Sequence, residues 1–257
     1  RIEMFDVVKN GAEEDGMPAY GEVISDKQVY ELVDYILAAI EDKKSEEFNA
    51  GNNEDVVFVS EGMQLKLELV AENADSPWAI TQSNDGRLFY TDKSGKLFAK
   101  QSDVIQEITG LPPVKYKGQG GLMDVILHPD FQNNQRMYLS YSKPKPDDDG
   151  YATTAVFSGV LENNEIVNGK DIFVAEPYVN TNHHFGCRMI FDNDGFLFVA
   201  VGERGRRDDH PQFLDNDLGK IHRLYDDGTV PVDNPFYNTP EARKSIYSYG
   251  HRNPQGL

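Results

Sequence analysis

The stretch Asn84-Asp85-Gly86-Arg87-Leu88-Phe89-Tyr90 reads as a tight turn followed by an alternating strand, and the pattern returns as Asn193-Asp194-Gly195-Phe196-Leu197-Phe198-Val199. Residues 129–141 fill a similar position with a longer turn. Such turns between runs of Val, Ile, Phe and Tyr are typical of β-hairpins, because glycine adopts the left-handed backbone that they require. The chain beyond residue 55 is therefore predicted to be mainly β.

The repeated turns begin at residues 84, 129 and 193, and this spacing is close to the length of one β-propeller blade. A β-sandwich would show similar turns, so the repeat alone leaves both folds open. If the fold is a propeller, residues 56–257 provide about three to four blades. The ring would then close with residues beyond this chain.

Composition narrows the class of protein. Hydrophobic residues make up 39% of the 257 residues and aromatic residues 11%, which is enough to build a folded core. The 43 acidic residues outnumber the 25 basic ones, and the net charge of −18 argues against a nucleic-acid or anionic-membrane partner. The only cysteine, Cys187, excludes an internal disulfide framework. No run of about 18 apolar residues predicts a membrane span.

The first residues have a different pattern from the rest. Residues 26–40 place Val29, Leu32, Val33, Ile36, Leu37 and Ile40 at helical spacing. Ser25 or Asp26 is a suitable N-cap for this helix. Residues 43–55 are polar and aperiodic, which is typical of a linker. We therefore expect a helical region over residues 1–42, an acidic linker over 43–55 and a β domain over 56–257.

The ends of the chain suggest an internal piece of a longer protein. The N-terminus has neither an initiator Met nor a signal peptide, and the C-terminus falls within Gly250-His251-Arg252-Asn253-Pro254-Gln255-Gly256-Leu257. That last stretch is too polar for a core, and its glycines and proline give it the character of a shaped loop. We expect further sequence on both sides.

Three polar segments are candidates for a functional site. In Gly118-Gln119-Gly120-Gly121, the glycines allow a tight turn that leaves the amide of Gln119 accessible, although an ordinary turn before a buried strand would look the same. Adjacent His183 and His184 would point to opposite faces of an extended backbone, so they make a poor chelating pair. One of them is a candidate base with Arg188 pairing a carboxylate nearby, and a purely structural histidine is the alternative. Residues 202–207 read GERGRR, an anion-seeking cluster or a charged turn.

Seven motifs occur in one order and together resemble a known family. They are Trp78 with the Asn84-Asp85-Gly86 turn, GQGGLMDVILHPDF at 118–131, NHHFGCR at 182–188, GERG at 202–205, LGKIHRL at 218–224, DNPF at 233–236 and GHRNPQGL at 250–257. This series resembles the glucose/sorbosone dehydrogenases, soluble pyrroloquinoline-quinone (PQQ) aldose dehydrogenases. The resemblance implies a six-bladed propeller, of which residues 56–257 hold the first three to four blades. It also implies oxidation of an aldose or related sugar to its lactone.

The resemblance assigns roles to individual residues. His184 matches the family's general base through its H-x-x-x-R spacing to Arg188. Arg252 and Asn253 match the residues at the quinone oxygens, and Gln119 matches a side chain that hydrogen bonds near substrate and cofactor. Arg204 corresponds to a cofactor-binding position at the rim of the pocket. The Ca²⁺ ligands and further basic cofactor-binding residues are expected beyond residue 257. Cys187 and Glu203 depart from the commonest form of their motifs.

The head of the chain has a resemblance of its own. Val8-Lys9-Asn10-Gly11, Gly16-Met17-Pro18-Ala19-Tyr20 and the helix through Ile36 resemble the final third of a c-type cytochrome. In that family the methionine, here Met17, is the second axial ligand of the haem iron, and the CxxCH attachment motif is expected upstream of residue 1. The alternative is that Met17 is a packing residue in a small helical domain. The cytochrome implies that electrons pass from PQQ through haem c to a respiratory acceptor, in the periplasm or outside the cell.

Two other functions remain open from the sequence. A propeller can bind a carbohydrate or a protein without catalysis, because a fold does not fix a function. A propeller hydrolase such as a lactonase would use metal-bound water instead of a quinone.

Overall fold

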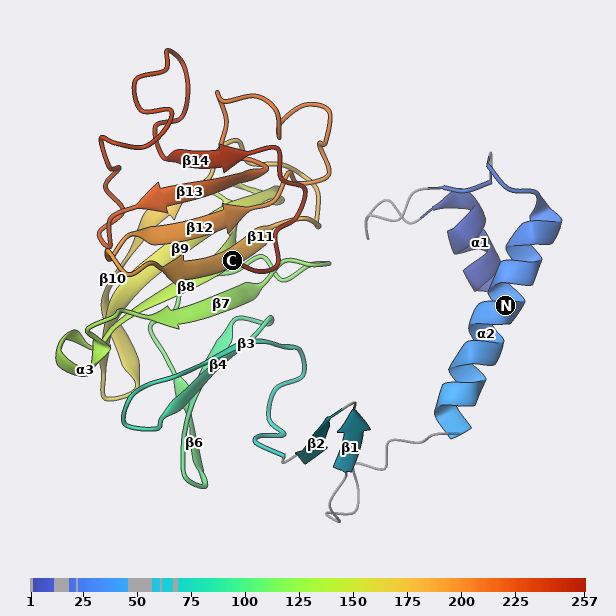
Figure 1. The fold of residues 1–257 in the computed structure, drawn as a ribbon, viewed down its shortest axis with the longest axis horizontal. Helices are drawn as coiled ribbons and strands as arrows, with labels where there is room; N and C mark the ends of the chain where they lie inside the picture. The colour runs from blue at the N-terminus through green and yellow to red at the C-terminus, as the bar shows by residue number, and fades with distance from the viewer. Residues whose placement is uncertain (1, 12–18, 22, 46–56, 61, 67–68) are drawn as a thin grey trace. The chain divides into compact units, whose positions relative to one another are not determined.

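The computed structural model describes residues 2–11, 19–21, 23–45, 57–60, 62–66 and 69–257. It divides into two compact units, Arg1–Asn73 and Ala74–Leu257. The chain is mainly β, with antiparallel sheets and few helices (Figure 1), as predicted. Met17, the predicted haem ligand, lies outside the described residues. No helix in the described part of the chain is both long and apolar enough to cross a membrane.

The first unit contains two packed helices, α1 (Ile2–Asn10) and α2 (Asp26–Ser45). Their contact is apolar and is formed by buried Phe5, Val8, Val29 and Val33. The helix predicted over residues 26–40 is thus present and continues to Ser45. Strands β1 (Val57–Ser60) and β2 (Met63–Lys66) form a separate two-stranded antiparallel sheet in this unit.

Ser25 caps α2 by the exchange of hydrogen bonds known as a capping box. The Gln28 backbone N–H donates to Ser25 Oγ at 3.5 Å, and the Ser25 backbone N–H donates to Gln28 Oε1 at 3.0 Å. These bonds satisfy two backbone donors that the first helical turn leaves without partners. The helix therefore begins where the polar pair Ser25 and Gln28 precedes the apolar stripe.

The second unit consists of antiparallel meanders. Across residues 74–257, all of which are described, the strands form three four-stranded sheets in which each strand pairs with the next along the chain. The first sheet holds β3 (Pro77–Gln82), β4 (Leu88–Asp92), β5 (Lys96–Gln101) and β6 (Val104–Ile108). The second holds β7 (Leu122–Leu127), β8 (Arg136–Lys145), β9 (Asp148–Glu162) and β10 (Glu165–Val174). The third holds β11 (Gly186–Phe191), β12 (Leu197–Val201), β13 (Lys220–Leu224) and β14 (Ile246–Tyr249).

The repeated Asn-Asp-Gly turns join the first two strands of a sheet, as their sequence predicts. Gln82 pairs with Leu88 across the first turn, and Phe191 pairs with Leu197 across the second. Gly86 and Gly195 have φ of 86° and 85°, the left-handed conformation that glycine adopts without steric cost. In the middle sheet, the short helix α3 (Phe131–Asn134) takes the place of the turn.

Neighbouring sheets pack against each other through their apolar faces. One core cluster joins the first sheet to the second and includes buried Phe89, Leu97 and Leu139. A second cluster joins the middle sheet to the third and includes Tyr138, Val156 and Val199. The middle sheet is therefore covered on both faces, as in successive blades of a propeller.

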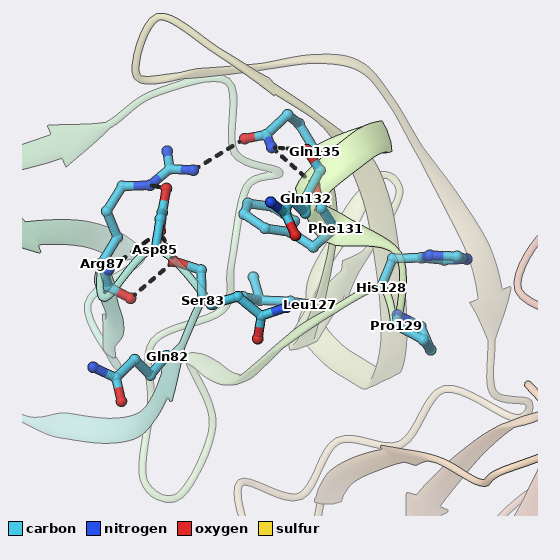
Figure 2. Close-up of a pocket in the computed structure, with 11 residues that line it drawn as sticks. Gln82, Ser83, Asp85, Arg87, Leu127, His128, Pro129, Phe131, Gln132 and Gln135 are labelled. Carbon is cyan, nitrogen blue, oxygen red and sulfur yellow. Dashed lines mark hydrogen bonds and ion pairs between the residues drawn. The ribbon is translucent and has the colours of Figure 1, made fainter.

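Arg87 joins the first two sheets at the end where the repeated turns lie. Its Nε donates to Asp85 at 2.9 Å, and its Nη2 donates to Gln135 Oε1 at 3.2 Å. Its guanidinium carbon lies 5.7 Å from the centre of the Phe131 ring. Figure 2 shows these side chains around a cavity of about 230 Å³ between the two sheets. The first turn of the repeat is thereby fastened to the next sheet.

The candidate site residues Gln119, His184, Arg204, Arg252 and Asn253 lie in connections at the other end of the sheets from the repeated turns. They occupy the connections that enter β7 and β11, the connection from β12 to β13, and the segment after β14. In an antiparallel meander every second connection falls at the same end of the strands, because successive strands run in opposite directions. The fold therefore gathers residues that are more than 130 positions apart in sequence, from Gln119 to Asn253.

Candidate active site

His184 is held by two side chains at the entrance to β11. Its backbone N–H donates to Gln119 Oε1 at 2.8 Å, and its Nδ1 lies 2.6 Å from Glu203 Oε1. The side chain is only 8% exposed. Its backbone has φ of 55°, in the left-handed region that few non-glycine residues adopt. The fold thus fixes both the backbone and the ring of this histidine.

Glu203 is a further candidate site residue, which the sequence motifs did not single out. It lies just after β12, where its backbone N–H donates to the carbonyl of Arg252 at 2.8 Å and its side chain is buried. Oε1 faces His184 Nδ1, whereas Oε2 is buried without a partner among the described residues. The sequence signal that could have found it is an acidic residue just after β12, the strand that pairs with β11, because the loop entering β11 carries His184.

The pairing with Glu203 determines which nitrogen of His184 can act. An ionised carboxylate accepts hydrogen bonds only, so the proton of a neutral imidazole resides on Nδ1. Nε2 then carries a lone pair, and no side chain or backbone group among the described residues hydrogen bonds to it. The arrangement leaves one nitrogen of a fixed imidazole available to accept a proton.

The segment after β14 lies directly against the histidine-bearing loop. Asn253 Oδ1 accepts hydrogen bonds from the Gly186 backbone N–H and from Gln255 Nε2, each at 3.0 Å. Because its carbonyl oxygen is occupied twice, the amide group of Asn253 is left to donate. The side chain of Arg252 is exposed, and no described residue hydrogen bonds to its guanidinium. These two residues offer an exposed cation and an amide donor on a segment that contacts the histidine loop.

Arg188 anchors this segment, and it pairs with a carboxylate as the sequence predicts. Its Nε donates to the Gln255 carbonyl at 3.0 Å, and its Nη1 donates to Asp124 Oδ1 at 3.2 Å. Asp124 is buried on β7 and accepts a further bond from the Met189 backbone N–H at 2.8 Å. Burial raises the pKa of the Asp124 carboxyl, while the bond from Met189 and the charge of Arg188 act in the opposite direction.

The predicted position of Arg204 at the rim of a pocket is wrong. Its side chain is 0% exposed, and its guanidinium donates to the backbone carbonyls of Ala152, Thr181 and His183. It also stacks 3.5 Å from the centre of the Phe185 ring. Burial lowers the pKa of Arg204 to about 9. The rim position is an implication of the family resemblance, whereas here Arg204 has a left-handed backbone and its side chain bonds to the backbone carbonyls of the loop before β11.

Cys187 follows the histidine loop and is also buried. Its Sγ lies 3.4 Å from the Phe185 carbonyl oxygen, and burial raises the pKa of the thiol to about 12. A thiol of this kind is a weak nucleophile at neutral pH, because the thiolate is the reactive form. Within the described residues, no group of three or more His, Cys, Asp or Glu side chains is arranged to hold a metal ion.

Comparisons with known proteins give a family match and several relatives. The Glucose / Sorbosone dehydrogenase family model matches residues 74–257. The aldose sugar dehydrogenase YliI of Escherichia coli is 41% identical over 199 residues, which cover 75% of this chain and 53% of the relative. Quinoprotein glucose dehydrogenase B of Acinetobacter calcoaceticus is 26% identical over 74% of this chain and 45% of its own length. This chain spans about half the length of these curated relatives.

Solved structures show the same fold. The apo form of the soluble aldose sugar dehydrogenase from Escherichia coli aligns with a TM-score of 0.67 at 41% identity, over 71% of this chain and 53% of that one. The PQQ-bound aldose sugar dehydrogenase from Streptomyces coelicolor aligns with a TM-score of 0.59 at 24% identity, over 79% of this chain and 57% of that one. At that identity, the second likeness concerns the fold alone.

Proposed function

This chain belongs to the Glucose / Sorbosone dehydrogenase family, and on that premise we propose that it carries the base and part of the cofactor site of a PQQ-dependent sugar dehydrogenase. The reaction is oxidation of an aldose or related sugar to its lactone. The observation that carries the proposal is the buried His184–Glu203 pair, with Nδ1 and Oε1 only 2.6 Å apart. The aldose sugar dehydrogenase YliI, at 41% identity, supports the choice of substrate class.

His184 accepts the proton of the sugar's C1 hydroxyl at Nε2. Glu203 holds the ring through Nδ1 and compensates the positive charge that the imidazole gains, which is the role of a carboxylate behind a catalytic histidine. Gln119 fixes the same residue through its backbone. A positioned base of this kind contributes on the order of 10²- to 10⁴-fold to the rate.

The residues after β14 suit a quinone cofactor. PQQ, when bound, supplies the oxidant that takes the hydride from C1. Arg252 offers an exposed guanidinium, and Asn253 offers an amide whose oxygen is already occupied. A cation and an amide donor are the groups that stabilise negative charge on quinone oxygens. Arg204 is left out of this site because it is buried under the loop.

We also propose that the three meanders belong to a six-bladed propeller. Their strand order and serial packing support this architecture. The proposal places the Ca²⁺ ligands and the remaining cofactor-binding basic residues in sequence beyond residue 257. Their presence can be checked by sequencing the gene past the codon for Leu257.

The helical first unit supports a further proposal, that residues 1–42 are the end of a c-type cytochrome. The packed helices α1 and α2 fit a small helical domain, and Met17 would be the axial ligand of haem c. Electrons would pass from the sugar site to the haem and on to a respiratory acceptor, in the periplasm or outside the cell. A reduced-minus-oxidised absorption spectrum of the complete protein tests the assignment, which fails if no haem is bound.

The dehydrogenase proposal is tested with the complete protein, PQQ and Ca²⁺. Aldoses are assayed with a dye as electron acceptor, and PQQ binding is measured separately by fluorescence. His184→Ala should abolish turnover while PQQ still binds. His128→Ala is the matched control, because His128 pairs with Asp226 at the opposite end of the sheets, and it should retain turnover.

Other outcomes would point to other functions. Folded protein that neither binds PQQ nor turns over aldoses would contradict the dehydrogenase. Sugar binding without PQQ would instead favour a non-catalytic propeller. Lactone hydrolysis that depends on an added metal would favour a hydrolase.

A further inference from the structure

A cavity of about 510 Å³ lies beside the candidate active site. It is bounded by the loop that enters β7, by the turn between β8 and β9, and by the loop that enters β11. Its polar lining consists of Lys115, Tyr116, Lys117, Asp149, Asn180 and Asn182. Asn182 links it to the site, because its carbonyl accepts the Gln119 backbone N–H at 2.8 Å, and Gln119 in turn holds His184.

The cavity is lined by two lysines, although the chain as a whole has a net charge of −18. Lys115 is partly buried, and its Nζ donates to the carbonyl of Gly150 at 2.6 Å, so the ammonium group is fixed. Lys117 lies two residues further on and lines the same space. The Nζ of Lys93 is held at 2.7 Å by the carbonyl of Gly118, just outside the lining. Two lysines thus line the cavity, and the third, Lys93, is fixed next to it.

Lys115 has other cations as well as two aspartates in its surroundings. The pKa of Lys115 is lowered, chiefly by burial and then by the charges of Lys117 and Arg204. These two cations outweigh Asp149 and Asp148, which act in the opposite direction. An anion bound here would relieve the repulsion among the cations. The cavity is therefore suited to a negatively charged group.

Tyr116 gives the cavity an apolar wall. It is 53% exposed, and its hydroxyl lies 3.5 Å from Ser76 Oγ. The Nζ of Lys93 lies 5.8 Å from the ring centre. A half-exposed aromatic ring beside the amides of Asn180 and Asn182 offers one apolar face and several hydrogen-bonding groups, the combination expected of a small-molecule site. A sugar ring with its apolar C–H face and polar edge matches this surface.

We propose that this cavity binds an acidic sugar unit, a uronic acid joined to the aldose that His184 deprotonates. Lys115 and Lys117 would bind the carboxylate, and the ring of Tyr116 would lie against the sugar. This inference rests on the proposed dehydrogenase function, and it narrows the substrate class to acidic oligosaccharides with a free reducing end.

The test compares two disaccharides that differ only in charge, glucuronosyl-β-1,4-glucose and glucosyl-β-1,4-glucose. Binding to the 257-residue chain is followed by NMR titration at low and at physiological salt. The acidic disaccharide should bind about tenfold more tightly at low salt, a ratio worth about 1.4 kcal/mol, and salt should reduce the difference. Lys115→Met and, separately, the exposed Lys117→Met should each reduce the preference. Lys170→Met, an equal loss of charge on an exposed residue of β10, should leave it unchanged.

Several results would overturn the proposal. The first is equal binding of the two disaccharides, and the second is a loss of preference in Lys170→Met as large as in the Lys115 and Lys117 variants. The third is displacement of the acidic disaccharide by PQQ, because the carboxylates of PQQ would then account for the lysines. Because this assay needs no turnover, it remains informative if the complete protein has no dehydrogenase activity. The complete protein could also oxidise both disaccharides with PQQ at equal kcat/KM. That result would support the dehydrogenase proposal and contradict the acidic-sugar site.

Discussion

At the scale of single residues, the central feature is the buried bond between His184 Nδ1 and Glu203. Replacing Glu203 with Gln keeps the size of the side chain but allows its amide to donate to Nδ1, which moves the histidine proton to Nε2. We expect Glu203→Gln to lower kcat by on the order of 10²- to 10⁴-fold with little change in PQQ affinity. Steady-state kinetics and a PQQ titration of the complete protein measure both effects. Glu203→Asp, which keeps the carboxylate, should lose less, and a loss equal to that of Gln would contradict the tautomer argument.

Cys187 gives a prediction about pH. Its folded pKa of about 12 lies above the value of about 8.5 for an unfolded thiol. The folded state therefore holds the proton more tightly, and this contribution to stability is complete below about pH 8.5 and is lost as pH rises toward 12. In urea unfolding at pH 8 and pH 10, Cys187→Ala should lose less stability between the two pH values than the original chain. An equal or greater loss in the variant would contradict the assignment.

At the scale of elements, the connection after β12 approaches the histidine loop closely. A Cβ built on Gly202 would lie 1.9 Å from the carbonyl oxygen of His184, whereas nothing lies within 4 Å of one built on Gly195. We therefore expect Gly202→Ala to lower the free energy of unfolding by about 2–3 kcal/mol. Gly195→Ala introduces no close contact and only places alanine at an unfavourable φ, so it should lower the free energy of unfolding by about 1 kcal/mol. Urea denaturation of the two variants measures the difference, and equal costs would show that the loop can move away.

The anchoring of the segment after β14 can be tested through individual amides. Arg188→Met removes the bonds to Gln255 and Asp124, and we expect the amides of Gly186 and Glu203, which donate to Asn253 and Arg252, to exchange hydrogen faster. Amides at the opposite end of the sheets, such as Gly195, should be unaffected in NMR-detected exchange. A uniform increase across the whole unit would indicate general destabilisation instead of local release.

Local pattern predicted the elements well and the arrangement of side chains less well. The Asn-Asp-Gly turns were predictable because glycine geometry is a property of a few adjacent residues, as Gly86 and Gly195 show. Glu203 and Arg204 were not, because their environments are formed by strands and loops distant in sequence. Glu203 and Arg204 are neighbours in one motif, yet the first side chain bonds to His184 and the second to backbone carbonyls under the loop. No periodicity in the sequence marks that difference.

At the scale of the whole molecule, the excess of negative charge affects the stability of the folded chain. With 43 acidic residues against 25 basic ones, repulsion between like charges destabilises the folded chain at low ionic strength. We expect the melting temperature of the 257-residue chain to rise by a few degrees between about 10 mM and 200 mM sodium chloride, since the Debye length falls to less than about 10 Å. Calorimetry measures the change, and an equal rise with an uncharged osmolyte of the same osmolality would contradict the electrostatic cause.

The contacts between the segment after β14 and the histidine loop have a consequence for how this architecture could diversify. The bond between residue 252 and Glu203 uses main-chain atoms on both sides, and the contact through residue 253 reaches the main chain of Gly186. The side chain at position 252 can therefore be exchanged without displacing His184. A lineage with this architecture is able to change the side chain at position 252 while the position of His184 stays unchanged.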